Sequence, residues 1–366
     1  MPYTESQRYW IWLASVHGLG ARRFDALVAR FGPAQRVWEE LSPLMGDIVG
    51  QSAYAELRKA RNPGYLDQLF EEMDKCGCVA ITREDPGYPA LLGTIEDSPP
   101  ILFVRGHTQL IDGNAIAIVG ARNCTAYGTR MARKIAKELS MAGVTVVSGL
   151  ARGIDSVAHR GAIDAEARTV AVLGSGVDIV YPNEHRMLAD EIIARGGSIV
   201  SELRPGTPPR GQHFPARNRI ISGMCQGLLL IEAAKRSGTM TTVGFALDQG
   251  REVFALPGQA DSPLSTSTHA LIRDGARLVT SAQDVLMDMG WIDEMAEEEA
   301  ILPTLTRAAR DVYMQLLGGQ TDVDALIDAL GVPAQEMNSL LTIMELQGII
   351  RRLPGRRVER IIPISE

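Results

Sequence analysis

The sequence predicts an α/β protein built around a doubly wound, mostly parallel sheet, with a further domain at each end of the chain. Between residues 107 and 290, six apolar or β-branched runs of strand length alternate with stretches of helical periodicity. Continuous apolar strands that alternate with helices are typical of a parallel sheet covered on both faces. Helical spacing dominates the two ends of the chain, which indicates separate helical segments there.

The composition is that of a globular protein of two or three domains. The chain has 366 residues, 45% hydrophobic and 22% charged, and its 37 basic and 44 acidic side chains give a net charge of −7. No run approaches the roughly 18 apolar residues that span a bilayer, and the first residues lack the pattern of a signal peptide. Four scattered cysteines argue against a disulfide framework. We therefore expect a cytoplasmic protein that is not bound to a membrane.

Residues 1–75 are expected to form a domain of short helices. Apolar residues from Trp10 to Leu19 follow helical spacing, the sequence HGLG interrupts it, and a second apolar stripe ends at Phe31. Two helices joined by a glycine turn are compatible with a SAM or helix-hairpin-helix-like domain, whose turn amides face phosphates. A small helical bundle with a glycine-rich turn is the alternative.

The α/β domain is expected at 76–290 and opens with an extended connector that holds one or two strands. Its parallel strands are predicted at 115–119, 144–147, 169–173, 198–200, 228–231 and 252–256. Helices are predicted at 126–141, 154–165, 187–195 and 239–249. Ligands of such sheets lie beyond the carboxyl ends of the strands.

Residues 291–300 are predicted to be an acidic linker, because the stretch 288–299 holds six acidic side chains and no basic one. The remaining segment, 301–366, shows three amphipathic helices and then two strand-like runs around Pro354. Three helices followed by a β-hairpin is the order of a winged helix.

Glycine or small polar residues follow five of the predicted strands, in the sequences GARNCTAYG, SGLARGID, GSGVD, SE and EAAKRSGT. Strand, glycine and helix in that order let backbone amides and a helix N-terminus face an anion. We expect these turns to form one phosphate-binding floor. The residues assigned to it are Gly120, Ser148, Gly149, Arg152, Gly174, Gly176, Ser237, Gly238 and Thr239.

The sequence lacks the common cofactor and catalytic motifs. The first turn lacks G-x-G-x-x-G and no Walker A sequence exists, so we expect no dinucleotide, ATP or other cofactor. Ser148, Asp155 and His159 could form a catalytic set, but the G-x-S-x-G elbow is absent. We expect Asp155 to orient its glycine turn, and Glu202 and Glu232 to accept hydrogen bonds from arginines or turn amides. The histidines show no metal-ligand spacing, so no metal site is expected.

The segment 204–236 carries six basic residues and one acidic residue. A basic groove with an interleaved aromatic ring suits a single nucleic-acid strand, because cations follow the backbone while the ring stacks a base. This interpretation assigns Arg210, Phe214, Arg217, Asn218 and Arg219 to nucleic-acid contacts. The alternative is that the arginines pair with acids on neighbouring elements.

The motifs from VGARNCTAYG through SGLARGIDSVAH, TVAVLGSGVDIVYPNEH, FPARNRIISG and EAAKRSGTMTT to GREVFALPG resemble the DNA-processing protein A (DprA, also called Smf) family over about 115–285. The resemblance implies a Rossmann-like domain that binds single-stranded DNA, protects it and helps to load the RecA recombinase. It also implies a homodimer and a role in natural transformation, or competence.

The same resemblance implies roles for particular residues. Arg122 corresponds to the arginine of the family's first glycine turn, which is implicated in DNA contact, and Phe214 and its neighbours fall on the F-P-x-R-N-R element. The first turn reads G-A-R where the family usually has G-S-R, so one hydroxyl is missing. Asp155, Asp178, Glu202 and Glu232 are expected to support the pocket. The segment 268–279 is associated with the dimer interface, which points to Leu271, Ile272 and Leu278.

Two other functions remain open. Similar Rossmann-like proteins of the LOG group cleave nucleoside monophosphates with a P-G-G-x-G-T element, but the comparable stretch EAAKRSGTMTT lacks the paired glycines. A transcription regulator acting through the winged helix is the other alternative. Its predicted recognition helix, 334–347, holds Glu336 and Glu345 and no basic residue. We therefore expect a DNA-binding protein that is not an enzyme.

Overall fold

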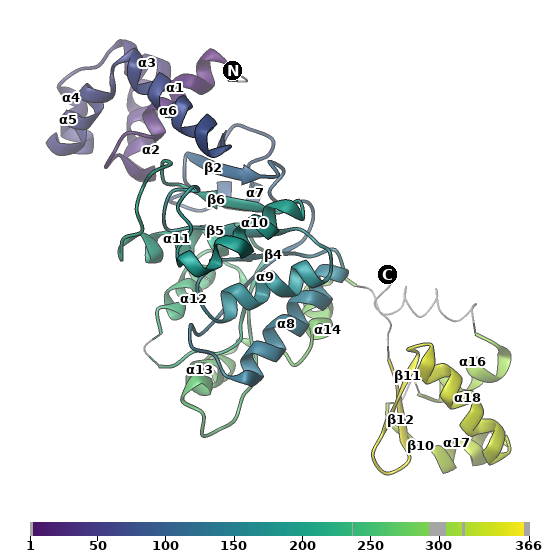
Figure 1. The fold of residues 1–366 in the computed structure, drawn as a ribbon. Coiled ribbons are helices and arrows are strands. Elements are labelled where there is room, and N and C mark those ends of the chain that lie inside the picture. Colours follow the sequence, from purple (N-terminus) through teal and green to yellow (C-terminus); the bar gives the residue numbers. More distant parts are fainter. Residues whose placement is uncertain (1–2, 236, 293–304, 317–318, 362–366) are drawn as a thin grey trace. The chain divides into compact units, whose positions relative to one another are not determined.

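The computed structural model describes residues 3–235, 237–292, 305–316 and 319–361 (Figure 1). The chain divides into two compact units, Met1–Ala282 and Gln283–Glu366. The first unit holds the N-terminal helices and the large sheet, and the second holds the C-terminal helices and a small sheet.

The N-terminal segment is helical, as predicted. Its helices are α1 Glu5–Ala14, α2 Gly20–Phe31, α3 Ala34–Glu39, α4 Leu44–Val49, α5 Gln51–Ala60 and α6 Pro63–Cys76. Thr4 starts α1 with a capping box, in which its hydroxyl accepts from the Gln7 amide. Between α1 and α2 the chain turns through Gly18 and Gly20, which both have positive φ angles. The predicted order of helix, glycine turn and helix is therefore present.

These helices share a core with the sheet. One buried cluster runs from Trp12 and Phe70 in the helices to Phe103 and Ile199 in strands. Figure 1 shows the helices beside the β1–β2 end of the sheet. The last N-terminal helix, α6, ends at Cys76, close to the expected boundary at residue 75. The N-terminal helices nevertheless belong to the same compact unit as the α/β domain.

The large sheet has nine strands in the order β1-β2-β6-β5-β4-β3-β7-β8-β9. Strands β3 to β9 run parallel, whereas β1 and β2 are antiparallel additions at one end. The strands are β1 Val79–Thr82, β2 Ile101–Gly106, β3 Ala115–Val119, β4 Thr145–Ser148, β5 Thr169–Val172, β6 Ser198–Ser201, β7 Gly227–Leu230, β8 Glu252–Ala255 and β9 Arg277–Leu278. The strand order reverses between β3 and β7, and such a switch point is where open α/β sheets bind ligands.

Helices cover both faces of this sheet. In β5, Ala171 joins the buried cluster that contains Ile163 of α9, whereas Val170 and Val172 join the cluster that contains Ile220 of α11. Alternate residues of a strand point to opposite faces, so the two clusters lie on opposite sides. The predicted doubly wound, Rossmann-like sheet is confirmed. The helices around it are α7 Ala90–Gly93, α8 Ala126–Met141, α9 Ile154–Asp164, α10 Arg186–Ala194, α11 His213–Gly223, α12 Thr239–Asp248 and α13 Thr266–Arg273.

Helix α11 was not anticipated, because its sequence HFPARNRIISG has little apolar periodicity and contains a proline. Pro215 stands in the first turn, where a missing backbone amide is tolerated. The segment that we interpreted as an open basic groove is therefore partly a helix that packs against the sheet. This difference decides where two of its arginines lie.

The second unit has the predicted winged-helix order. Helix α14, Ala282–Asp288, begins at the boundary between the two units. The elements after it are α16 Arg307–Gln315, β10 Thr321–Asp322, α17 Val323–Leu330, α18 Ala334–Leu346, β11 Ile350–Leu353 and β12 Arg357–Arg360. The hairpin β11–β12 is joined by β10 in a three-stranded sheet over a core that includes Val312 and Leu341. Most of the predicted acidic linker, 291–300, lies outside the described residues.

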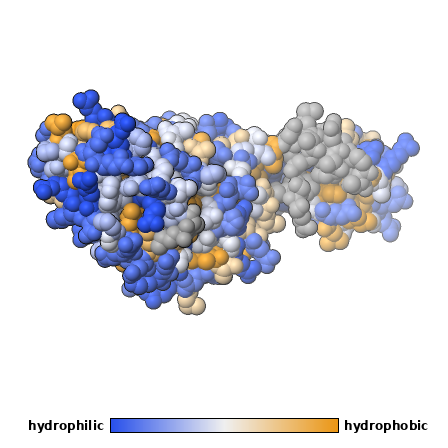
Figure 2. Space-filling view, turned by 90° about the horizontal axis from the view of Figure 1, so that it is seen from above, coloured by the Kyte–Doolittle hydropathy of each residue, from blue (hydrophilic) through white to orange (hydrophobic). Residues whose placement is uncertain are grey.

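The described residues contain no helix whose length and apolar character would let it cross a membrane. Apolar side chains on the face drawn in Figure 2 are scattered among hydrophilic ones.

Candidate nucleic-acid interface

The first two glycine turns pack directly on one another at the carboxyl edge of the sheet. Gly153 has a φ of +74°, and a Cβ atom there would lie 2.2 Å from the Ala121 carbonyl oxygen and 2.5 Å from that of Arg122. The Ile154 amide donates to the Ala121 carbonyl at 3.2 Å. Only glycine permits this contact of backbone with backbone. It fixes the main chain of Arg122, whose side chain is exposed.

Gly120 lies at the switch point, where three segments meet. A Cβ atom on Gly120 would lie 2.6 Å from the Ile154 side chain and 3.1 Å from the Glu232 carbonyl oxygen. The Thr239 hydroxyl donates to the Gly120 carbonyl at 3.0 Å, and the Ser237 hydroxyl donates to that of Thr239 at 3.0 Å. These contacts join the turns after β3, β4 and β7, which are three of the five turns from which the sequence predicts a phosphate-binding floor.

Arg122 and Phe214 lie together beside this floor. The Arg122 guanidinium carbon is 6.0 Å from the centroid of the Phe214 ring, within the range of a cation–π contact. The ring lies on the glycine turn after β5, since a Cβ atom on Gly174 would be 3.0 Å from Phe214 Cδ1. A cation and a half-buried ring are therefore neighbours at the carboxyl edge, although they are 92 positions apart in the sequence.

Arg217 does not lie on the surface, which corrects its predicted place in a phosphate track. It is 5% exposed, and its guanidinium donates to the carbonyl oxygens of Gly149 and Val172. Burial lowers the pKa of Arg217 to about 10, against the attraction of the buried Asp155. Burial also raises the pKa of Asp155, against the attraction of Arg217. The two buried charges attract one another, and the hydrogen bond from Arg217 to the Gly149 carbonyl supports the turn after β4.

Arg219 does not lie on the surface either, which corrects its predicted role in nucleic-acid contacts. Its guanidinium is paired with two carboxylates. Its side chain is 8% exposed and lies 2.6 Å from Glu202 and 3.0 Å from Asp97. This is the alternative considered for the basic segment, in which arginines pair with acids of neighbouring elements. Glu202 accepts from an arginine, as we expected of it.

Glu232 and Asp178 bind turn amides. The Glu232 carboxylate accepts from the Thr125 amide at 2.9 Å and from the Thr125 hydroxyl at 2.5 Å, at the N-terminus of α8. A negative group is favoured there by the helix dipole. Asp178 accepts from the Gly206 amide at 2.9 Å. Both carboxylates therefore shape the loops around the floor.

The remaining predicted contact residues differ in accessibility. Arg152 is exposed and pairs with Glu184 at 2.6 Å. Arg210 is exposed, and no ion pair or hydrogen bond of its side chain is found within the described part of the chain. Ser148 is fully buried, and its hydroxyl donates to the Ile118 carbonyl at 2.6 Å. Gly149 and Gly176 are buried, Asn218 is half-buried, and Gly238 is exposed just before α12.

The possible catalytic set does not assemble. Ser148 is bound to Ile118, and His159 Nδ1 lies 2.8 Å from the Thr169 hydroxyl. His159 is fully buried and its Nε2 has no hydrogen-bond partner. Among the described residues, no group of three or more His, Cys, Asp or Glu side chains could hold a metal ion.

The buried His159 predicts a pH-dependent stability. Burial lowers its pKa to about 3, whereas an unfolded histidine titrates near 6.5. The unfolded chain therefore takes up the proton first, so the stabilisation is complete above pH 6.5 and is lost as the pH falls towards 3. Between pH 8 and pH 5 this group should remove about 2 kcal/mol from the free energy of unfolding.

Urea unfolding at the two pH values measures this loss. In a His159→Gln variant the difference between pH 8 and pH 5 should shrink by about 2 kcal/mol, because glutamine does not titrate. An unchanged difference would mean that His159 does not cause the pH dependence.

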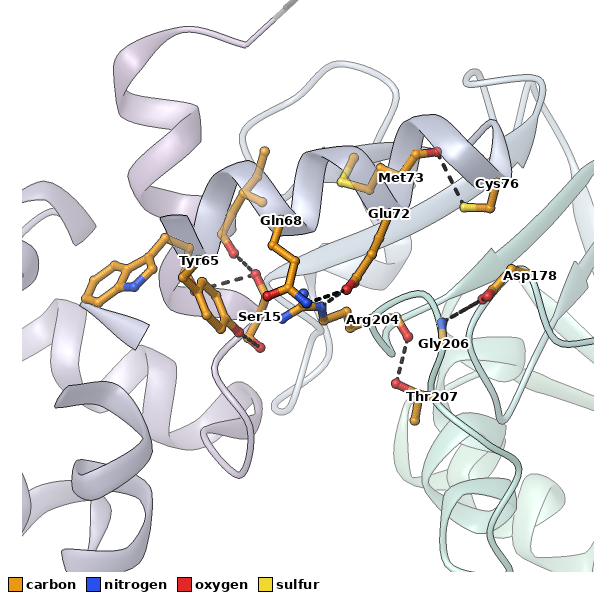
Figure 3. Close-up of polar contacts among 12 residues, drawn as sticks. Ser15, Tyr65, Gln68, Glu72, Met73, Cys76, Asp178, Arg204, Gly206 and Thr207 are labelled. Atoms are coloured by element: carbon orange, nitrogen blue, oxygen red, sulfur yellow. Dashed lines mark hydrogen bonds and ion pairs between the residues drawn. The ribbon is translucent and has the colours of Figure 1, made fainter. Parts of the chain in front are cut away.

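A cavity lies between the N-terminal helices and the segment 202–213, and Asp178 of the turn after β5 also lines it. Its volume is about 1110 Å³, and the Gly18–Gly20 turn forms part of its wall. Figure 3 shows Arg204 bound to Glu72, at 2.8 Å, and Gly206 bound to Asp178. The Arg204 guanidinium also lies 5.0 Å from the centroid of the Tyr65 ring. These contacts connect the helices to the segment that leads into α11.

The residues expected at a dimer interface lie at the far end of the sheet. Strand β9 forms its last position and pairs with β8. Leu278 in β9 is 51% exposed, Ile272 is half-buried and Leu271 is 9% exposed. An edge strand with an exposed leucine is available for pairing.

In the second unit, the predicted recognition helix α18 is in contact with strand β11 of the wing. Arg352 of β11 lies 3.4 Å from Glu345 and donates to the Asn338 carbonyl at 3.0 Å and the Thr342 hydroxyl at 2.9 Å. Helix α18 itself contains no basic residue. Such a surface does not favour contact with duplex phosphates.

Comparison with known proteins agrees with these observations. The family model of DNA recombination-mediator protein A matches residues 79–290, and that of the DprA winged helix domain matches 296–356. Protein Smf of Escherichia coli is 40% identical over 283 residues, which are 75% of each chain.

Two solved structures are also similar. The X-ray structure of DNA processing protein A from Streptococcus pneumoniae has a TM-score of 0.66 and 34% identity, and the match covers 78% of this chain and 98% of that one. A structure from Helicobacter pylori, which concerns the single-stranded DNA binding mode of its DNA processing protein A, has a TM-score of 0.51 and 27% identity. That match covers 57% of this chain and 95% of the other. The glycine turns, the doubly wound sheet and these matches together establish that the chain belongs to the DNA recombination-mediator protein A (DprA/Smf) family.

Proposed function

We propose that the protein binds single-stranded DNA at the carboxyl edge of its large sheet. The observation that carries this proposal is the pairing of exposed Arg122 with the Phe214 ring beside the joined glycine turns. Arginine contacts phosphate, backbone amides add hydrogen bonds, and the ring stacks a base. Arg210 is free to extend the basic track, whereas Arg217 and Arg219 hold the pocket together from within.

The likeness to the Helicobacter pylori protein, which binds single-stranded DNA, supports this assignment. On the same family basis we propose that the protein acts in DNA processing during natural transformation, where it protects incoming strands and loads the RecA recombinase. We place it in the cytoplasm, and we propose that it works by binding rather than by catalysis. A homodimer through the β9 edge would present two DNA sites, and sedimentation at micromolar concentration tests whether it forms.

Replacing Phe214 by alanine tests the site. Base–aromatic stacking contributes about 1–3 kcal/mol, so the variant should bind a dT oligomer roughly tenfold more weakly. Fluorescence anisotropy with the labelled oligomer measures this change, and the duplex of the same length should bind less tightly to the parent protein. A variant that binds dT as tightly as the parent would exclude the stacking role.

The nucleotide-hydrolase alternative makes a separate prediction. A LOG-like enzyme would release free base from AMP, and chromatography of the incubated mixture detects it. Ser148 and His159 are bound to other partners, so the structure gives no support to hydrolysis by that pair. The regulator alternative is weakened by the acidic α18 and is tested by footprinting a duplex with the full chain.

A further inference from the structure

We propose that Tyr181 forms, together with Phe214, a two-ring platform on which bases of the bound strand stack. The inference rests on the proposed function and adds to that site a residue which the sequence analysis did not single out. It also gives the site a chemical preference: bases of any kind, held by their faces rather than by their hydrogen-bonding edges.

The two rings come from a loop and from a helix, and they lie close together. Their centroids are 5.6 Å apart and their planes are inclined by 44°. Tyr181 belongs to the segment between β5 and α10, whereas Phe214 is the second residue of α11. Tyr181 is 47% exposed, so much of its ring faces solvent although Phe214 is its neighbour. An aromatic pair that is only partly covered offers apolar area to a planar ligand.

The loop that carries Tyr181 is held on both sides of the ring. Before it, Val180 is buried and the Ser175 hydroxyl donates to the Ile179 carbonyl at 2.6 Å. After it, Glu184 accepts from Arg152 at 2.6 Å, and His185 Nδ1 lies 2.8 Å from the Leu150 carbonyl. A ring held in this way loses little conformational freedom when a base stacks on it.

The positive charge beside the rings favours a nucleic-acid strand, which carries phosphates, over a free base, which carries none. The Arg122 guanidinium lies 6.0 Å from the Phe214 ring, so phosphate and stacking contacts are available side by side. Proteins that bind single strands with little sequence preference stack bases on aromatic rings and contact the phosphate backbone with neighbouring cations. Every base has a π-face, so the platform predicts weak dependence on sequence and strong dependence on the presence of bases.

The experiment compares a dT oligomer with an abasic oligomer of equal length. Tyr181→Leu keeps apolar contact with Phe214 but removes the flat ring, whereas Tyr181→Phe keeps the ring and removes the hydroxyl. The leucine variant should lose roughly fivefold or more in affinity for dT and less than twofold for the abasic strand. The phenylalanine variant should bind both as the parent does. Met187→Ala, at a site that is 84% exposed at the start of α10, is the surface control and should change neither affinity.

The outcomes separate this inference from the proposed function. If Tyr181→Leu binds dT as the parent does, or loses equally on both oligomers, the platform is wrong. If Arg122→Ala and Phe214→Ala also leave dT affinity unchanged, the proposed site itself fails. Thermal melting of each variant establishes that a lost affinity does not reflect unfolding.

Discussion

An Arg217→Met variant is expected to lose about 3–5 kcal/mol of unfolding free energy, because it removes the buried cation that attracts the Asp155 carboxylate. Two main-chain carbonyls, those of Gly149 and Val172, also lose their donor. Urea unfolding followed by tryptophan fluorescence measures the change. A double variant, Arg217→Met with Asp155→Asn, should recover part of the loss, since no buried charge then remains.

Arg210→Met is the matched control. Arg210 is exposed, so its replacement should alter the unfolding free energy by less than about 0.5 kcal/mol while it weakens the binding of single-stranded DNA. If Arg217→Met unfolds at the same urea concentration as the parent, Arg217 does not have the supporting role assigned to it.

An Arg122→Ala variant is expected to bind single-stranded DNA roughly ten- to a hundredfold more weakly, because a charge-assisted contact contributes about 1.5–3 kcal/mol. Its stability should change little, because the Arg122 side chain is exposed. The dependence of affinity on salt should also become shallower, by about 0.7 in the logarithmic slope for each phosphate that the variant no longer neutralises.

Arg195→Ala makes the same change of charge at the opposite edge of the sheet. Arg195 follows α10 and precedes the start of β6, whereas Arg122 follows the end of β3. The control should bind DNA nearly as the parent does. Equal losses in the two variants would point to a general effect of net charge rather than to a site at the carboxyl edge.

The strands and the glycine turns were predictable from the sequence because local patterns encode them. Short apolar runs such as AIAIV, followed directly by glycine, favour buried strands, and a turn such as SGLARGID contains the positive-φ glycine that the structure requires at Gly153. The floor followed from one rule of topology, namely that parallel strands end at the same edge.

The positions of individual side chains were less predictable. Charge counting treats every arginine as exposed, yet Arg217 and Arg219 of α11 are buried. The carboxylates that pair with Arg219 come from other segments of the chain. The helix itself was missed because its few apolar residues lack clear periodicity. The contact of Tyr181 with Phe214 joins a loop residue to a helix residue 33 positions away, and no local pattern encodes such a contact.

Photocrosslinking tests the central claim most directly. A single strand that contains 5-iodouracil is bound by the full chain and irradiated, and the modified peptide is identified by mass spectrometry. Since this base reacts with rings on which it stacks, the account predicts crosslinks at Phe214 or Tyr181 that disappear in Arg122→Ala at limiting protein. Crosslinks confined to the N-terminal helices or to the C-terminal unit would contradict it.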